Sequence, residues 1–132
     1  MEKRESVPIT CTIRLRLKKT SYFFGPGVLE VLQLVEKTDS LQTAAATMEM
    51  SYSKAWKIVR AAEQELGFKL MDRRVGGVGG GSSQLTPRGK DFVARFEQFS
   101  SASSEATNLL FEQYFGDFNQ RESDEQYPRG GE

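Results

Sequence analysis

Hydroxyl and basic side chains gather in one stretch near the middle of this 132-residue chain. Short hydroxyl donors at a helix start, followed by ammonium and guanidinium groups, suit phosphate oxygens and the edges of nucleic-acid bases. Lys54 and Lys57 are one helical turn apart, so both can reach the same surface. The pattern predicts a nucleic-acid-binding helix, the alternative being a solvated amphipathic helix. Its candidate contacts are Ser51, Tyr52, Ser53, Lys54, Lys57 and Arg60.

A second basic group borders a glycine-rich loop over residues 76–81. A loop with few side chains can approach a phosphate backbone closely. The Gly-Lys-Ser/Thr ending of a nucleotide-binding P-loop is missing, so a nucleotide site is not favoured. We interpret the loop as the tip of a hairpin that contacts DNA phosphates. The candidate contacts outside the helix are Arg73, Arg74, Ser82, Ser83 and, at the start of a preceding short helix, Thr43.

The residue inventory argues against catalysis. The chain has no histidine and a single cysteine, Cys11, so neither a disulfide framework nor a histidine-based or metal-based catalytic group can be assembled. Cys11 lies in an alternating pattern and is expected to be a packed or inert thiol. We therefore expect no enzyme activity and no cofactor.

Charge is distributed unevenly although the net charge is zero. Residues 40–90 carry 8 basic and 4 acidic groups, whereas residues 91–132 carry 3 basic and 9 acidic groups. A basic segment followed by an acidic one fits a local phosphate-binding face with a solubilising tail.

The spacing of apolar residues predicts the elements that position these groups. Alternation indicates a strand near the N-terminus, and helical periodicity follows the Gly25-Pro26-Gly27 break. Asp39-Ser40 and Ser51 or Ser53 are helix caps, and Gly67 is a helix end. The expected elements are a strand over 10–19, helices over 28–37, 41–48 and 51–66, strands over 69–75 and 82–85, and a helix from Thr86-Pro87.

The third helix has one apolar face and one polar face. Ala55, Val59, Ala62 and Leu66 share a face at helical spacing and are expected to point into the core. Tyr52 and Trp56 are one turn apart; packing for structure is favoured for them over contact with DNA.

The last helix carries much apolar surface, which needs a partner. We interpret it as a dimerisation helix, interrupted around Ser100 to Ser104, with folding back onto its own domain as the alternative. The residues from Gly116 onward are polar and acidic, and are expected to be disordered. The candidate dimer contacts are Phe92, Phe96, Phe99, Leu109, Leu110 and Phe111.

Three helices, a hairpin and a further helix make a mainly α fold with a small β component, typical of a winged helix-turn-helix. The chain resembles the N-terminal DNA-binding domain of ModE-type molybdate-responsive regulators, itself related to the LysR-type winged helix. The resemblance is carried by SYSKAWK, RRVGGVGGGS and LTPRGK, within residues 25–95. It implies a prokaryotic homodimer, joined through the last helix with help from N-terminal segments, that presents two recognition helices to a palindromic operator in double-stranded DNA.

The chain departs from that family at its end. ModE-type regulators continue into molybdate-binding domains, for which residues 116–132 have no room. Molybdate sensing by this chain is therefore not expected, and a separate effector protein is one possible source of its signal.

No long apolar run and no signal peptide are evident, so we expect a cytoplasmic protein without a membrane span. The rival hypothesis is a winged-helix protein-interaction module that does not bind DNA. The expected organisation is an N-terminal segment with a strand (1–24), a winged helix-turn-helix domain (25–90), a dimerisation helix (91–115) and an acidic disordered tail (116–132).

Overall fold

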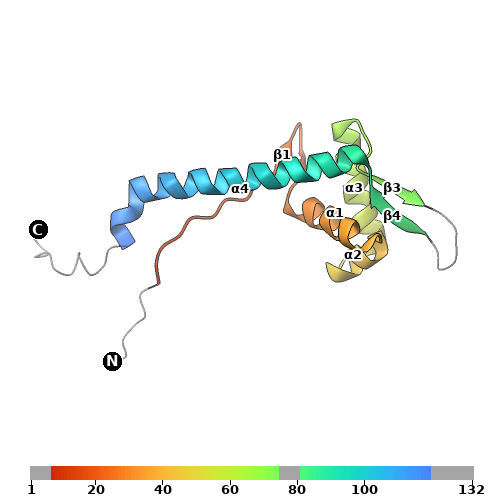
Figure 1. Cartoon of the computed structure of the whole chain (residues 1–132), viewed down its shortest axis with the longest axis horizontal. Helices are drawn as coiled ribbons and strands as arrows, with labels where there is room; N and C mark the ends of the chain where they lie inside the picture. The colour runs from red at the N-terminus through yellow and green to blue at the C-terminus, as the bar shows by residue number, and fades with distance from the viewer. Residues whose placement is uncertain (1–6, 75–80, 120–132) are drawn as a thin grey trace, which may run out of the picture. The chain divides into compact units, whose positions relative to one another are not determined.

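Helices dominate the computed structural model, which describes residues 7–74 and 81–119. The chain separates into two units, residues 14–99 and residues 1–13 with 100–132. The elements are β1 (Leu17–Lys18), β2 (Tyr22–Phe24), α1 (Pro26–Thr38), α2 (Leu41–Thr47), α3 (Tyr52–Leu66), β3 (Met71–Arg74), β4 (Ser82–Leu85), α4 (Pro87–Phe115) and a 3-10 turn, η1 (Gly116–Asn119) (Figure 1). The predicted mainly α fold with a β-hairpin and a long last helix is confirmed.

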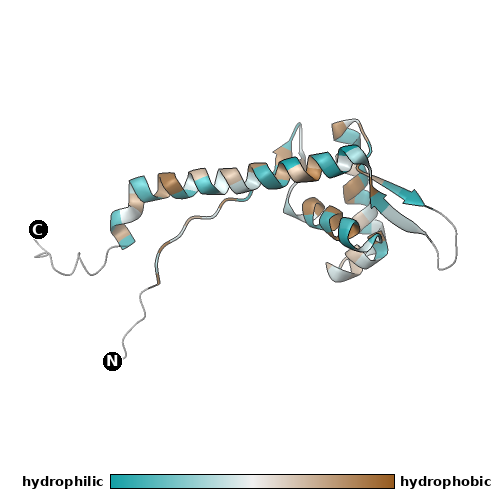
Figure 2. Ribbon diagram, in the orientation of Figure 1, coloured by the Kyte–Doolittle hydropathy of each residue, from teal (hydrophilic) through white to brown (hydrophobic). Residues whose placement is uncertain are grey.

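The core lies where α1, α2 and α3 meet. Figure 2 shows hydrophobic bands alternating with hydrophilic ones along α1, as expected of a helix with one buried face. The predicted inward face of α3 is confirmed, with Ala55, Val59 and Ala62 fully buried and Leu66 partly buried. Other core side chains are Phe24, Val31, Leu32, Val35, Leu41, Ala44, Leu70, Met71, Leu85 and Val93.

Hydroxyl caps fix the helix starts. The Ser40 Oγ accepts a hydrogen bond from the Thr43 N–H at 2.9 Å, and the Ser51 Oγ accepts one from the Lys54 N–H at 3.0 Å. Gly67 ends α3 with φ of 83°, a left-handed conformation that costs glycine little. Of the caps proposed from sequence, Ser40 and Ser51 serve, while Asp39 instead ends α1.

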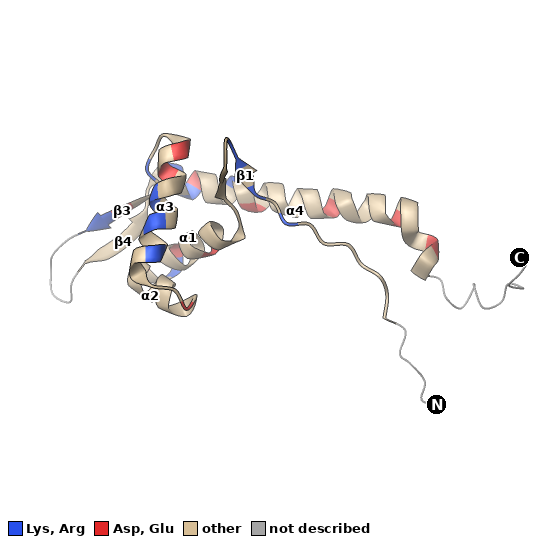
Figure 3. Cartoon of the chain, turned by 180° about the vertical axis from the view of Figure 1, so that it is seen from behind, with Lys and Arg blue, Asp and Glu red and all other residues tan. Residues whose placement is uncertain are grey.

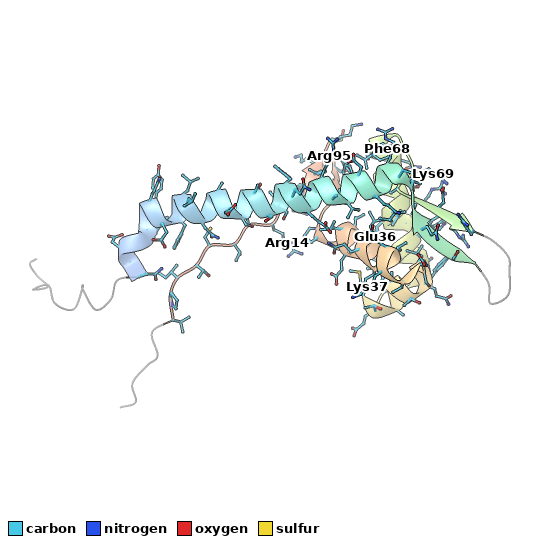
Figure 4. The ribbon with its side chains drawn as sticks, in the orientation of Figure 1. Arg14, Glu36, Lys37, Phe68, Lys69 and Arg95 are labelled. Atoms are coloured by element: carbon cyan, nitrogen blue, oxygen red, sulfur yellow. The ribbon has the colours of Figure 1, made fainter. Side chains whose placement is uncertain are left out.

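The base of the β3–β4 hairpin is fastened to the first turn of α4. The Thr86 Oγ1 accepts from the Gly89 N–H at 2.9 Å and donates to the Lys69 carbonyl at 2.7 Å. A Cβ on Gly89 would lie 2.1 Å from the Leu70 carbonyl oxygen, so only glycine allows this approach. Figure 4 labels Phe68 and Lys69, which lie in the segment joining α3 to β3.

Glu63 connects α3 to the start of β3, a contact that was not predicted from the sequence. This carboxylate is on α3, is only 9% exposed, and its Oε2 accepts from the Leu70 N–H at 2.8 Å and the Met71 N–H at 3.2 Å. It therefore satisfies two backbone donors where the chain enters β3.

The N-terminal strand is shorter than predicted. Only Leu17–Lys18 pairs, antiparallel to a strand at Tyr22–Phe24 that the sequence analysis did not identify. Alternation does hold in part, since Cys11, Leu15 and Leu17 are half-buried. Residues 10–16 lack a partner strand among the described residues, which is why their alternating pattern does not become a strand.

The last helix is longer and more regular than predicted. α4 runs without interruption through residues 100–104, because serine and alanine inside a helix cost at most about 0.7 kcal/mol per residue. Residues 116–119 form η1, where disorder was expected, and Asn119 exchanges two hydrogen bonds with the backbone of Ile9, at 2.8 and 2.9 Å. The remainder of the predicted tail, and the glycine-rich loop apart from Gly81, lie outside the described residues.

Candidate nucleic-acid interface

The exposed face of α3 carries most of the candidate contacts. Ser53, Lys54, Lys57 and Arg60 are all exposed, on the helix whose opposite face is buried in the core. Ser51, at the N-cap, uses its oxygen as an acceptor from the Lys54 N–H, which leaves its hydroxyl hydrogen available to a ligand.

The β3 strand brings a further arginine to α3. The Arg73 guanidinium carbon lies 5.3 Å from the centre of the Trp56 ring and 5.8 Å from that of the Tyr52 ring. Arg60 approaches the Trp56 ring from α3 itself, at 5.8 Å. Tyr52 and Trp56 thus form an aromatic surface on which the two arginines rest. Trp56 was not among the candidate contacts; its spacing from Tyr52 was noted, but the pairing across to β3 has no local signal.

A groove of about 370 Å³ lies between the hairpin and the start of α2. Its lining combines hydroxyl, amide and guanidinium groups from Ser40, Gln42, Tyr52, Arg73 and Ser82. The exposed Gln42 was missed by the sequence analysis, whereas the predicted neighbour Thr43, although exposed, does not line the groove.

Ser83 also borders this groove, but its side chain does not fit its predicted role as a phosphate contact. Its side chain is 4% exposed, and its N–H donates to the Asp39 carbonyl oxygen at 3.0 Å. Successive residues of a strand point to opposite faces, so Ser83 faces the core while Ser82 remains partly exposed. Arg73 and Arg74, which pair with Ser83 and Ser82 in the sheet, are both exposed.

The described residues do not neutralise the basic groups of this face. Within residues 7–74 and 81–119, no carboxylate lies within 4.0 Å of the basic groups at Lys54, Lys57, Arg60, Arg73 or Arg74. Figure 3 shows basic segments on α3 and β3, and another on β1 beyond α3. The face can therefore attract a polyanion. In the part of the chain that the structure covers, no three His, Cys, Asp or Glu side chains are grouped so as to hold a metal ion.

The predicted dimer contacts divide into two groups. Phe96 is 5% exposed, and both it and Phe92 have ring centres 4.9 Å from that of Phe24. These two residues fold back onto their own domain, as the alternative interpretation foresaw, because β2 offers them an aromatic partner that the sequence analysis did not identify.

The other predicted dimer contacts on α4 are exposed or partly exposed. Phe99 and Leu109 are 52% and 66% exposed, Leu110 is also exposed, and Phe111 is half-buried with its ring centre 5.5 Å from that of Phe115. Three further exposed aromatic residues near the end of the helix were not in the predicted set: Tyr114, Phe115 and Phe118.

Comparison with known proteins finds a family model that matches the candidate interface. Residues 27–90, from α1 to the start of α4, match the model described as the bacterial regulatory helix-turn-helix protein of the lysR family. These residues form a LysR-type helix-turn-helix domain. The candidate contacts on α3 and on the described parts of the hairpin all lie within this LysR-type domain.

Two curated relatives extend the similarity. The molybdenum-pterin-binding protein MopB of Rhodobacter capsulatus is 29% identical over 86 residues, which are 65% of this chain and 32% of that protein. The DNA-binding transcriptional dual regulator ModE of Escherichia coli is 26% identical over 102 residues, 77% of this chain and 38% of that protein. The resemblance to ModE-type regulators is confirmed, and the chain spans about a third of the length of these relatives.

One solved structure also shows a partial likeness to this chain. ArgP of Mycobacterium tuberculosis matches with a TM-score of 0.47 and 21% identity, over 64% of this chain and 30% of that one.

Among the described helices of the present chain, none is long and apolar enough to cross a membrane.

Proposed function

We propose that this chain is a sequence-specific transcription regulator that binds palindromic duplex DNA as a homodimer. The observation that carries the proposal is the exposed basic face of α3, extended by Arg73 across the Trp56 ring, within a LysR-type helix-turn-helix domain. In such domains α3 enters the major groove and the hairpin lies against neighbouring phosphates.

The residues of this face have different roles in the proposal. Lys57 and Arg60 extend from the middle of α3 toward bases and phosphates, and the hydroxyl groups at its start donate to the backbone. Arg74 and Ser82 contact phosphates from the hairpin, and Arg73 joins the two elements. Thr43 and Gln42 are phosphate contacts at the start of α2, whereas the buried Ser83 has no direct contact.

In the proposal, the exposed part of α4 forms the contact between the two copies of the homodimer. Phe99, Leu109 and Leu110 offer apolar side chains that a second copy would cover, and two-fold pairing would present two α3 helices to two half-sites. In this organisation residues 25–90 bind DNA and residues 91–115 hold the dimer. A regulator of this kind acts on the chromosome, which places it in the cytoplasm of a prokaryotic cell, with any effector supplied by another protein or domain.

The test is selection from randomised duplex DNA by the purified protein at two salt concentrations. We expect a palindromic site whose affinity falls steeply with salt. Lys57→Gln should weaken binding and reduce the magnitude of the salt slope by about 1. The control Arg95→Gln removes a charge on α4 that is paired with Asp91 at 3.1 Å, and should leave both quantities unchanged. No enrichment over bulk DNA would contradict the proposal.

A protein-interaction module is the second candidate, favoured by the exposed apolar surface of α4. It predicts that simultaneous neutralisation of Lys54, Lys57, Arg73 and Arg74 leaves function intact. The DNA-binding proposal requires the same quadruple variant to lose its operator.

A further inference from the structure

A second basic groove lies along α3, formed with the β1–β2 hairpin and the start of α1. Its volume is about 660 Å³, and all of its lining residues fall within residues 14–61. Arg14 and Arg16 come from the N-terminal segment and Lys54 from the first turn of α3. Phe23, Met50 and Ile58 contribute apolar surface, and none of the lining residues is acidic.

The β1–β2 hairpin is held against α3 at the other end of that helix. The Lys19 Nζ donates to the Glu65 carbonyl oxygen at 3.1 Å and lies 3.9 Å from the Glu65 Oε1. Phe24, at the end of β2, is buried in the core. The hairpin is therefore a fixed neighbour of α3.

Arg16 is positioned by its surroundings. Its guanidinium carbon lies 3.8 Å from the centre of the Tyr22 ring. A Cβ on Gly25 would approach the Arg16 Cγ to 2.8 Å, so the glycine leaves the space through which this side chain passes. An arginine stacked on an aromatic ring loses less side-chain entropy when it binds an anion than a free one does.

We infer that Arg14 and Arg16 contact DNA phosphates that flank the segment read by α3, on the side away from the β3–β4 hairpin. The inference rests on the proposed function and extends its footprint. Lys54 links the two surfaces, since it lies on the DNA-facing helix and also lines this groove. Figure 3 shows α3 between the basic segments of β3 and β1, and Figure 4 places Arg14 near the start of α1.

A polymer backbone fits this groove better than an enclosed small anion. Arg14, Arg16 and Lys54 are all exposed, whereas a small-ligand site normally surrounds most of its ligand. No carboxylate lies within 4.0 Å of the basic groups of these three residues in the described part of the chain, so their charge is available. Phosphates passing along this groove would meet cations from the N-terminal segment and from α3.

The experiment compares two duplexes carrying the selected operator, one with long flanks and one trimmed to the palindrome. For Arg14→Gln/Arg16→Gln we expect several-fold weaker binding to the long duplex. The magnitude of its salt slope should fall by about 2, since each lost phosphate contact removes about 1. On the trimmed duplex the variant and the wild type should bind alike. Arg95→Gln is the charge control, and inorganic phosphate at millimolar concentration is the competitor that tests for a small-anion site.

The outcomes separate this inference from the proposed function. Equal loss on both duplexes would indicate a general charge effect and overturn the flanking contact. Unchanged binding of the double variant, with Lys57→Gln still impaired, would overturn the inference alone. If free phosphate abolishes the effect of the Arg14 and Arg16 substitutions on DNA affinity, the groove binds a small anion instead. A wild-type protein that binds neither duplex would overturn both.

Discussion

Arg73 on β3 and Trp56 on α3 are in cation–π contact, with 5.3 Å between the guanidinium carbon and the ring centre. The two residues are far apart in sequence, and their contact joins the two elements proposed to meet DNA. Trp56 is thus a positioning residue for Arg73, and the pair should be energetically coupled in binding.

A double-mutant cycle on operator affinity measures that coupling. Trp56→Leu and Arg73→Ala should each weaken binding, and the double variant should lose less than the sum by about 0.5–1 kcal/mol, the usual range for an exposed cation–π pair. Trp56→Phe, which keeps a ring, should retain most of the affinity. The control cycle pairs Trp56→Leu with Arg74→Ala, for which no stacking is present, and should be additive. Additivity in both cycles would show that Trp56 does not position Arg73.

Removal of the Glu63 carboxylate should destabilise the domain. Glu63→Ala leaves the N–H groups of Leu70 and Met71 without their acceptor in a buried place, at a cost of about 1–3 kcal/mol for each unsatisfied group. Urea unfolding followed by circular dichroism gives the free energy of unfolding. Gln64→Ala, an exposed neighbour on the same helix, is the control and should change it little. Equal stability of the two variants would contradict the assigned role of Glu63.

Two glycine-to-alanine substitutions should have opposite effects. Gly89→Ala would place a methyl group against the Leu70 backbone and should lower the free energy of unfolding by about 3 kcal/mol. Gly27→Ala lies in the first turn of α1, where a Cβ meets nothing within 4 Å, and should raise stability by up to about 1 kcal/mol. Thermal unfolding of both variants checks the prediction. A Gly89→Ala protein as stable as the wild type would mean that α4 can move away from Leu70 without cost.

Charges on the apolar end of α4 should disrupt self-association. Leu109→Glu and Leu110→Glu place carboxylates on surface that a second copy is proposed to cover, where an unpaired buried charge is costly. Sedimentation equilibrium should show a shift from dimer to monomer. Asn108→Glu adds the same charge at an adjacent exposed position and serves as the control. If all three variants associate like the wild type, the dimer contacts must lie elsewhere.

Local patterns predicted the helices of this domain well, because their signals are short-range. Ser51, Gly67 and the Ala55–Val59–Ala62 face each depend on residues within one or two helical turns. Contacts that depend on the tertiary fold could not be predicted from such local patterns. The partner of Phe96 is Phe24 and that of Glu63 is the backbone of Leu70, and neither pairing leaves a local periodicity.

The candidate interface shows the same division. Exposure of Lys54 and Lys57 follows from helical spacing against the buried face of α3. The burial of Ser83 depends on the register of a short strand, where a shift of one residue would have exposed its side chain. The groove that contains Arg16 requires the β1–β2 pairing. This pairing was not predicted, because the alternating N-terminal pattern indicated a single longer strand.

The hydrogen bond from the Ser83 N–H to the Asp39 carbonyl oxygen ties β4 to the turn between α1 and α2 before any DNA is present. Fixing the backbone of one residue costs about 1–2 kcal/mol in conformational entropy. For the residues of β4 this cost is met during folding and is not subtracted from the free energy of association. The strand and the turn between α1 and α2 are therefore held together, and under the proposed function a duplex whose groove spacing differs would have to deform to fit the hairpin. The stiffness of the DNA would then contribute to the choice of site, even at base pairs that no side chain touches.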